Sequence, residues 1–218
     1  MITFRQALQS GKFVITADLS TTGALSAQKF MGISRELHGS VDGIQLAANP
    51  VDKYLMSPVA QAIMLQREGI DAIAGLDCRD RNRIALQSDL LGLRAAGITS
   101  VMFGEGRISR QHAGTAKTVF DSSRRELVSM AKSLNEEESG SAESTLLIGT
   151  PATVFTPGPQ WNAGELGDLA NAGARFLQTQ LVFDIEILRQ YMQVLVDSRL
   201  TWSFAVIVTL APLPSASA

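Results

Sequence analysis

Hydrophobic and polar positions follow two different periods along this chain. Short apolar runs rich in β-branched residues predict buried strands, and apolar residues three or four positions apart predict amphipathic helices. The predicted strands cover residues 12–17, 43–47, 70–76, 99–103, 145–149, 175–180 and 203–208. The predicted helices cover residues 24–38, 58–67, 81–96, 119–134, 164–172 and 184–197. Strands and helices therefore alternate over nearly the whole chain.

This alternation repeats about every 30 residues, which is typical of βα units that form a parallel sheet with right-handed crossovers. No Gly-x-Gly-x-x-Gly motif follows the first predicted strand, and Gly104-Glu105-Gly106 stands alone, so a barrel is favoured over a Rossmann sheet. We expect one α/β domain over residues 1–218, of the (β/α)8 TIM-barrel type.

The predicted strands are one fewer than a closed (β/α)8 barrel needs. The sequence therefore predicts a barrel that lacks its last strand and helix units at the C-terminus. Open sheet edges are unfavourable unless they are covered, so a homo-oligomer or a partner chain is expected at the open edge.

Composition and charge narrow the class of protein. The chain has 19 Lys and Arg against 21 Asp and Glu, and the basic residues form no stripe, so nucleic-acid binding is not expected. No apolar run reaches the roughly 18 residues that span a bilayer, and the N-terminus lacks a signal-peptide core, so we expect a cytoplasmic protein without a membrane span. With one cysteine, Cys78, and two histidines, His38 and His112, no disulfide or metal site is expected.

The most polar strand end follows the predicted strand 70–76. Its sequence is Asp77-Cys78-Arg79-Asp80-Arg81-Asn82-Arg83. Charge concentrated where a parallel strand ends is where α/β folds place their chemistry. The alternative is a salt-bridged helix start with Asp80 near the N-terminus of the helix. Cys78 is interpreted as a small buried residue, not as a nucleophile.

Other strand ends supply further candidate residues for the same site. Asp18 at the floor of a pocket is a candidate general acid, with a pKa raised by burial, or else a helix cap. Gln180 both donates and accepts, which suits recognition of the edge of a heterocycle, or else it is bonded to backbone. Gly104 and Gly106 permit close backbone approach to a ligand, and Arg107 can pair with an anion, although a simple turn explains them as well.

Four segments, in this order and spacing, resemble methylenetetrahydrofolate reductases, and the resemblance extends from about residue 13 to residue 214. The segments are Thr-Ala-Asp-Leu at 16–19, Cys-Arg-Asp-Arg-Asn-Arg at 78–83, Val-Phe-Asp at 119–121, and Ala-Gly-Ala-Arg-Phe through Thr-Gln-Leu-Val-Phe-Asp at 172–184. The resemblance implies a (β/α)8 barrel with FAD at the carboxyl ends of its strands. It also implies reduction of 5,10-methylene-tetrahydrofolate to 5-methyl-tetrahydrofolate, with NAD(P)H or another reductant as electron donor.

The resemblance assigns roles to individual residues. Asp18 is the catalytic acid that protonates the folate, and Glu105 is the second catalytic residue. Gln180 and Asn49 are the residues that bind the folate substrate. The residues implied to contact FAD are Ala47, Leu76, Asp77, Gly106, Arg107, Phe120 and Thr150.

The sequence departs from the family mainly at the flavin. Gly75 stands where the family has a flavin-contacting His, and Leu169 stands where it has a Lys. Arg107 falls where the family has an Asp unless the alignment shifts by one residue, which brings Glu105 there. At the catalytic acid, Asp18 replaces a Glu. Two alternatives to the reductase stay open: a flavin-independent, folate-binding protein of one-carbon or methyl transfer, and a non-catalytic subunit of such a complex.

Overall fold

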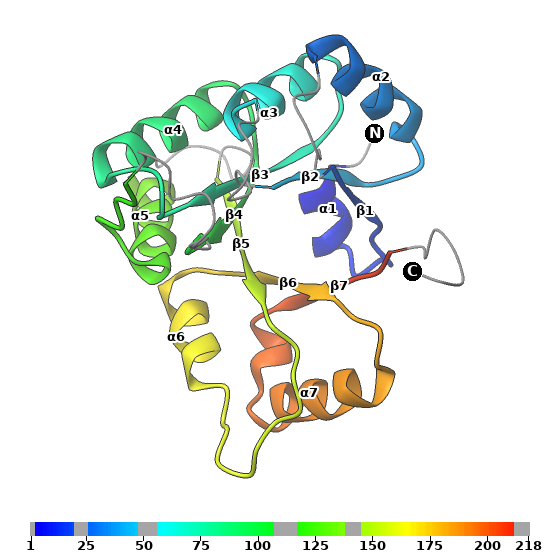
Figure 1. Ribbon diagram of the computed structural model, residues 1–218, viewed down its shortest axis with the longest axis vertical. Helices are drawn as coiled ribbons and strands as arrows, with labels where there is room; N and C mark the ends of the chain where they lie inside the picture. The colour runs from blue at the N-terminus through cyan, green and yellow to red at the C-terminus, as the bar shows by residue number, and fades with distance from the viewer. Residues whose placement is uncertain (1–2, 20–25, 48–55, 107–116, 138–144, 212–218) are drawn as a thin grey trace. The chain divides into compact units, whose positions relative to one another are not determined.

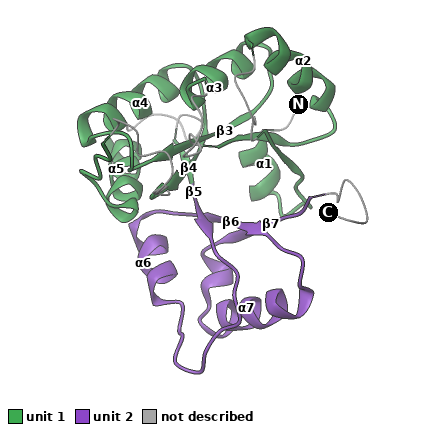
Figure 2. Cartoon of the chain, in the orientation of Figure 1, with its two compact units in different colours: residues 1–148 green, residues 149–218 purple. Residues whose placement is uncertain are grey.

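The structure is a computed structural model that describes residues 3–19, 26–47, 56–106, 117–137 and 145–211. The chain forms two compact units, Met1–Ile148 and Gly149–Ala218 (Figure 2). Asn49 and Arg107, two of the residues predicted to bind ligands, lie outside the described residues.

Unit 1 contains a parallel sheet whose strands follow chain order. Its strands are β1 (Thr16–Asp18), β2 (Gly43–Leu46), β3 (Ala72–Asp77) and β4 (Ser100–Gly104). Its helices are α1 (Phe4–Gln9), α2 (Ala27–Leu37), α3 (Pro58–Arg67), α4 (Arg83–Ala95) and α5 (Arg124–Glu137). Figure 1 shows α2, α3 and α4 along one side of this sheet and α1 on the other.

Unit 2 continues the same alternation of strands and helices. Strand β5 (Leu147–Ala152) spans the division between the units, and β6 (Phe176–Leu181) pairs in parallel with both β5 and β7 (Ala205–Thr209). Helices α6 (Gly164–Ala172) and α7 (Ile185–Asp197) connect the strands, and a short 3-10 helix, η2 (Leu200–Trp202), precedes β7. The described part of the chain thus has seven parallel strands with helices between them, which confirms the predicted α/β fold of (β/α)8 type.

The two largest differences from the predicted helices lie at the starts of α1 and α5, and capping explains both. Helix α1 was not predicted; the Thr3 hydroxyl accepts the Gln6 N–H, and the Gln6 side chain accepts the Thr3 N–H. Helix α5 begins at Arg124 instead of residue 119, because the Ser123 hydroxyl accepts the Glu126 N–H while the Glu126 carboxylate accepts the Ser123 N–H. Such reciprocal bonds satisfy backbone donors that the first helical turn leaves without partners.

The two faces of the unit 1 sheet have different characters. Successive residues of a strand point to opposite faces. One face is apolar and fully buried beneath the helices; its residues are Ile44, Leu46, Ala72, Ala74, Leu76, Val101 and Phe103. We call the other face the inner face. On it, Asp18, Gln45, Ile73 and Ser100 lie side by side on the four strands from β1 to β4, and Asp77 on β3 lies beside Gly104 on β4. Helix α1 covers the start of the inner face, where Phe4 packs against Gly43. A Cβ added to Gly43 would lie 3.1 Å from Phe4 Cβ.

Candidate functional site

Asp77 lies at the carboxyl end of β3 and is enclosed by two glycines. A Cβ on Gly104 would lie 2.4 Å from Asp77 Oδ1. A Cβ on Gly106, which has φ +83°, would lie 2.5 Å from Arg79 Cβ and 3.3 Å from Asp77 Oδ2. The two glycines therefore make room for side chains of the protein itself. The space that the sequence analysis reserved for a ligand beside them is filled by Asp77 and Arg79.

Arg79 and Asp80 form a bidentate ion pair directly after Asp77. The buried Arg79 guanidinium donates from Nε to Asp80 Oδ1 at 2.6 Å and from Nη2 to Asp80 Oδ2 at 2.5 Å. The hydrogen bond from Arg79 holds the pKa of Asp80 below its ordinary value. Asn82 caps α4, with its Oδ1 accepting the Ala85 N–H at 2.9 Å. The salt-bridged helix start considered from the sequence is present, although Asp80 pairs with Arg79 and does not cap the helix.

The Asp77 carboxyl has a strongly perturbed pKa. Burial raises this pKa from 3.8 to about 6, an effect that Arg79 and Arg81 oppose and Asp80 strengthens. Asp77 can therefore hold or release a proton near neutral pH, as groups in functional sites often do. The neighbouring Cys78 is fully buried, and burial raises its pKa to about 11, so it is a thiol at neutral pH and the interpretation of Cys78 as a small buried residue is confirmed.

The raised pKa of Asp77 predicts a pH dependence of stability. Between pH 4 and 6, approximately, the folded protein keeps a proton that the unfolded chain has lost, so stability falls as pH rises through this window and stays lower above it. Asp77→Asn is expected to remove the part of this fall that Asp77 causes, which is about 3 kcal/mol for a pKa shift of about two units. Asp71 and Asp89, whose pKa values burial also raises, keep their own contributions to the fall. Urea unfolding at intervals from pH 4 to pH 7 measures it. Asp197→Asn, at an exposed position on α7, is the control and is expected to keep the fall; a fall of the same size in Asp77→Asn would contradict the prediction.

Asp18, the predicted catalytic acid, is exposed at the end of β1. The expectation that it is buried at the floor of a pocket was wrong, because β1 is a three-residue strand at the edge of the unit 1 sheet. Its register neighbour on the inner face is Gln45. The structure thus places an exposed carboxyl next to a buried amide.

Gln45 and Ser100 are candidate site residues that the sequence analysis missed. Gln45 is 1% exposed, and neither its Oε1 nor its Nε2 has a hydrogen-bond partner among the described residues. The buried Ser100 Oγ on the same face also lacks one there. Buried polar groups without partners cost about 1–3 kcal/mol each and call for an explanation such as water or ligand. In the sequence, Gln45 and Ser100 each stand as a polar residue inside an apolar run predicted to be a strand, and this pattern could have indicated buried polar groups.

Gln180 lies in unit 2 and is fixed by the backbone of Val154. Its Oε1 accepts the Val154 N–H at 2.7 Å, and its Nε2 donates to the Val154 carbonyl at 2.8 Å. The alternative that Gln180 is bonded to backbone is therefore correct, but these two bonds do not use all the hydrogen-bonding capacity of the side chain. A primary amide has two donor hydrogens and two acceptor lone pairs, so one of each is left for a ligand at this exposed position.

The other predicted residues differ in accessibility. Ala47 is half-buried just past β2, and Glu105 is exposed just past β4. Phe120 is 40% exposed with φ +41°, and it follows Val119, whose N–H donates to the Arg79 carbonyl at 2.7 Å. Phe120 is therefore held near the charged turn after β3.

The residues that the sequence resemblance implies for FAD contact differ in how far they are buried. Leu76 and Thr150 are fully buried, and Leu76 lies on the face that the helices cover. The space beside Gly106 is occupied by Asp77 and Arg79. Leu76 and Thr150 therefore offer no exposed side chain to a flavin, whereas Ala47 and Phe120 of the same predicted set are accessible.

A groove of about 640 Å³ lies elsewhere in unit 1, between α4 and α5. Arg83, Gln87 and Ser129 are among its lining residues. None of the predicted site residues lines it. The carboxyl ends of the strands are the better candidate site, because the unpaired amide of Gln45 and the perturbed carboxyl of Asp77 both lie there.

Parallel strands alternating with helices, with ionisable side chains at the strand ends, define a protein of the (β/α)8 class. The chain belongs to the methylenetetrahydrofolate reductase family, whose model matches residues 5–217. The resemblance noted in the sequence is thereby confirmed. No curated protein matches the chain significantly in sequence.

Several solved structures share the fold. The chain is similar to 2,3-dimethylmalate lyase of the PEP mutase/isocitrate lyase superfamily, with 14% identity and a TM-score of 0.59 over 95% of this chain and 81% of that one. It is also similar to an uncharacterised protein from Clostridium thermocellum that binds two copies of 5-methyl-5,6,7,8-tetrahydrofolic acid, with 14% identity and a TM-score of 0.58 over 98% and 71%. Deoxyribose phosphate aldolase from Aeropyrum pernix has 12% identity and a TM-score of 0.52 over 90% and 74%. At these identities the similarities establish the fold alone.

Membrane-spanning helices and metal-holding clusters are both absent from the residues that the structure describes. No helix among them is long and apolar enough to cross a membrane. Within the same residues, no three His, Cys, Asp or Glu side chains are grouped so that they could hold a metal ion.

Proposed function

We propose that this protein binds a reduced folate and reduces 5,10-methylene-tetrahydrofolate to 5-methyl-tetrahydrofolate. Membership of the methylenetetrahydrofolate reductase family over residues 5–217 carries the proposal. A structural neighbour that binds 5-methyl-tetrahydrofolic acid supports it. A cytoplasmic location and a homo-oligomer or partner chain at the open sheet edge belong to the same proposal.

The reaction asks three things of the protein. The bond between the methylene carbon and one folate nitrogen breaks, that nitrogen takes a proton, and the carbon takes a hydride from NAD(P)H or another reductant. Asp18 is exposed at the end of β1, where a bound folate can reach it, and serves as the proton donor. Gln180 offers the pterin edge one N–H and one lone pair, and Asn49 is a second folate contact.

Two acidic residues near β4 adjust the charge of the site. Glu105 is exposed directly after β4, and Asp77 holds a proton at pH values below about 6. A protonated Asp77 donates a hydrogen bond to a ligand oxygen or nitrogen, and an ionised one accepts. The activity is expected to change with pH near 6 for this reason, whichever residue is the proton donor.

A second candidate function is a flavin-independent, folate-binding protein of one-carbon or methyl transfer, either alone or as a non-catalytic subunit. The filled space beside Gly106 and the buried Leu76 and Thr150 favour it over a flavoprotein. It keeps the folate contacts and needs no redox group.

An absorbance spectrum of the purified protein, with and without added FAD, separates the two functions. The reductase predicts flavin bands that bleach with NADH and recover when 5,10-methylene-tetrahydrofolate is added. A colourless protein that FAD does not stabilise, and that does not oxidise NADH with this folate, would contradict the reductase. Folate binding under those conditions, or a heteromeric mass in solution, would establish the second candidate.

A further inference from the structure

The amide of Gln180 is oriented by a segment far away in the sequence. Both of its bonds go to Val154, which is 26 positions earlier and 7% exposed. Because these bonds use the N–H and the carbonyl of one residue, they fix the plane of the amide and hence the direction of its remaining donor and acceptor. The orientation of Gln180 therefore depends on what holds the Val154 backbone in place.

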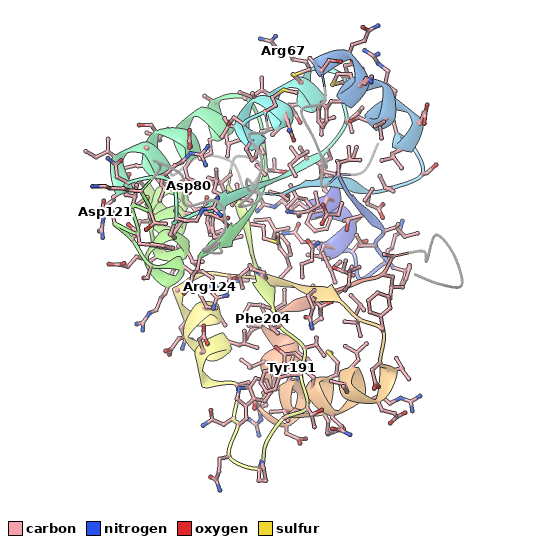
Figure 3. All side chains as sticks on the ribbon, in the orientation of Figure 1. Arg67, Asp80, Asp121, Arg124, Tyr191 and Phe204 are labelled. Atoms are coloured by element: carbon pink, nitrogen blue, oxygen red, sulfur yellow. The ribbon has the colours of Figure 1, made fainter. Side chains whose placement is uncertain are left out.

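An aromatic cluster holds the chain directly after Val154. The ring of Phe155 meets Trp161 edge-on with centroids 4.9 Å apart, and it meets Tyr191 at 5.8 Å. Trp161 stacks on Tyr191 at 5.1 Å with an interplanar angle of 27°. Tyr191 belongs to α7 (Figure 3), and it is 2% exposed. The cluster ties the segment between β5 and α6 to the core of unit 2.

We propose that Phe155, Trp161 and Tyr191 are positioning residues that keep Gln180 oriented for its ligand. This inference rests on the proposed function, in which Gln180 hydrogen-bonds the edge of a pterin. The cluster acts on the ligand through Gln180 and Val154. Since Phe155 is joined to Val154 by a peptide bond, loss of the ring contacts frees the Val154 peptide groups and with them the amide. Ordering a side chain before binding improves affinity because less freedom is lost when the ligand binds.

Equilibrium dialysis with 5-methyl-tetrahydrofolate tests the inference. Trp161→Leu is expected to raise the Kd about fivefold, the effect of mobilising one polar side chain, while Trp161→Phe keeps a ring and stays near the wild-type value. Trp202→Leu is the matched control, because Trp202 is 84% exposed on η2, and it is expected to leave the Kd unchanged. Phe155→Leu, at a more exposed position of the cluster, is used if Trp161→Leu does not fold.

A double-mutant cycle separates positioning from direct contact and from simple damage. In the Gln180→Ala background, Trp161→Leu is expected to have no further effect on the Kd, because the group that the cluster orients is gone. An additional fivefold loss there would overturn the inference, as would an unchanged Kd in Trp161→Leu with Gln180 intact. The proposed function survives both of these outcomes. Failure of the wild-type protein to bind the folate would overturn the function together with the inference.

Discussion

Gly149→Ala is expected to lower the free energy of unfolding by about 3 kcal/mol or more, at the upper end of the costs of overpacking. Gly149 in β5 is the register partner of Phe176 in β6. A Cβ on Gly149 would lie 2.1, 2.3 and 2.5 Å from three ring carbons of Phe176. The ring is fully buried in unit 2, so it cannot swing into solvent, and either the strands separate or the ring leaves its position.

Urea unfolding of Gly149→Ala measures this cost. Gly158→Ala is the control, because a Cβ there meets nothing within 4 Å, and it is expected to keep the wild-type stability. Shortening the ring in the double variant Gly149→Ala/Phe176→Leu is expected to make the glycine substitution less costly than it is alone. A urea midpoint for Gly149→Ala equal to that of the wild type would contradict the packing of the Phe176 ring against Gly149.

Gly106→Ala is expected to destabilise unit 1 by about 2–5 kcal/mol, from two sources that add. An L residue at φ +83° costs about 1–2 kcal/mol, and forcing a Cβ into filled space costs about 1–3 kcal/mol. The filled space is that of Arg79 Cβ at 2.5 Å, which is close to the backbone and cannot rotate away.

Gly39→Ala measures the first source alone, so the difference between the two variants gives the second. Gly39 has a similar φ of +86°, but a Cβ there meets nothing within 4 Å, so this variant carries the backbone cost without the steric one. Thermal or urea unfolding is expected to show a larger loss for Gly106→Ala. Equal losses in the two variants would mean that Asp77 and Arg79 do not fill the space in front of Gly106.

Much of the fold follows from local sequence signals. Helices α3 and α6 have the predicted bounds, since Pro58 starts the first and Gly173 ends the second. The starts of α1 and α5 were missed although their capping pairs, Thr3 with Gln6 and Ser123 with Glu126, stand three positions apart in the sequence. Polar caps, and not the apolar spacing, set these two helix starts.

The site was predicted in part, for a physical reason. The charges after β3 marked the correct strand end, because a run of ionisable residues after an apolar strand is visible locally. The more distant packing around those charges was not visible. The space beside Gly106 is filled by Asp77 and Arg79, and Gln180 is bonded to Val154; both contacts join residues more than 20 positions apart and depend on strand register. The unpaired amide of Gln45 likewise emerges only once burial is known.

Isothermal titration calorimetry of the wild-type protein with 5-methyl-tetrahydrofolate tests the central claim, that this member of the methylenetetrahydrofolate reductase family binds a reduced folate. The account predicts saturable binding that weakens in Gln180→Ala, because the amide loses its hydrogen bonds to the pterin, and that is unchanged in Gln193→Ala, at an amide on α7 whose partner is Asp197. Absence of saturable heat with both 5-methyl- and 5,10-methylene-tetrahydrofolate would contradict the account.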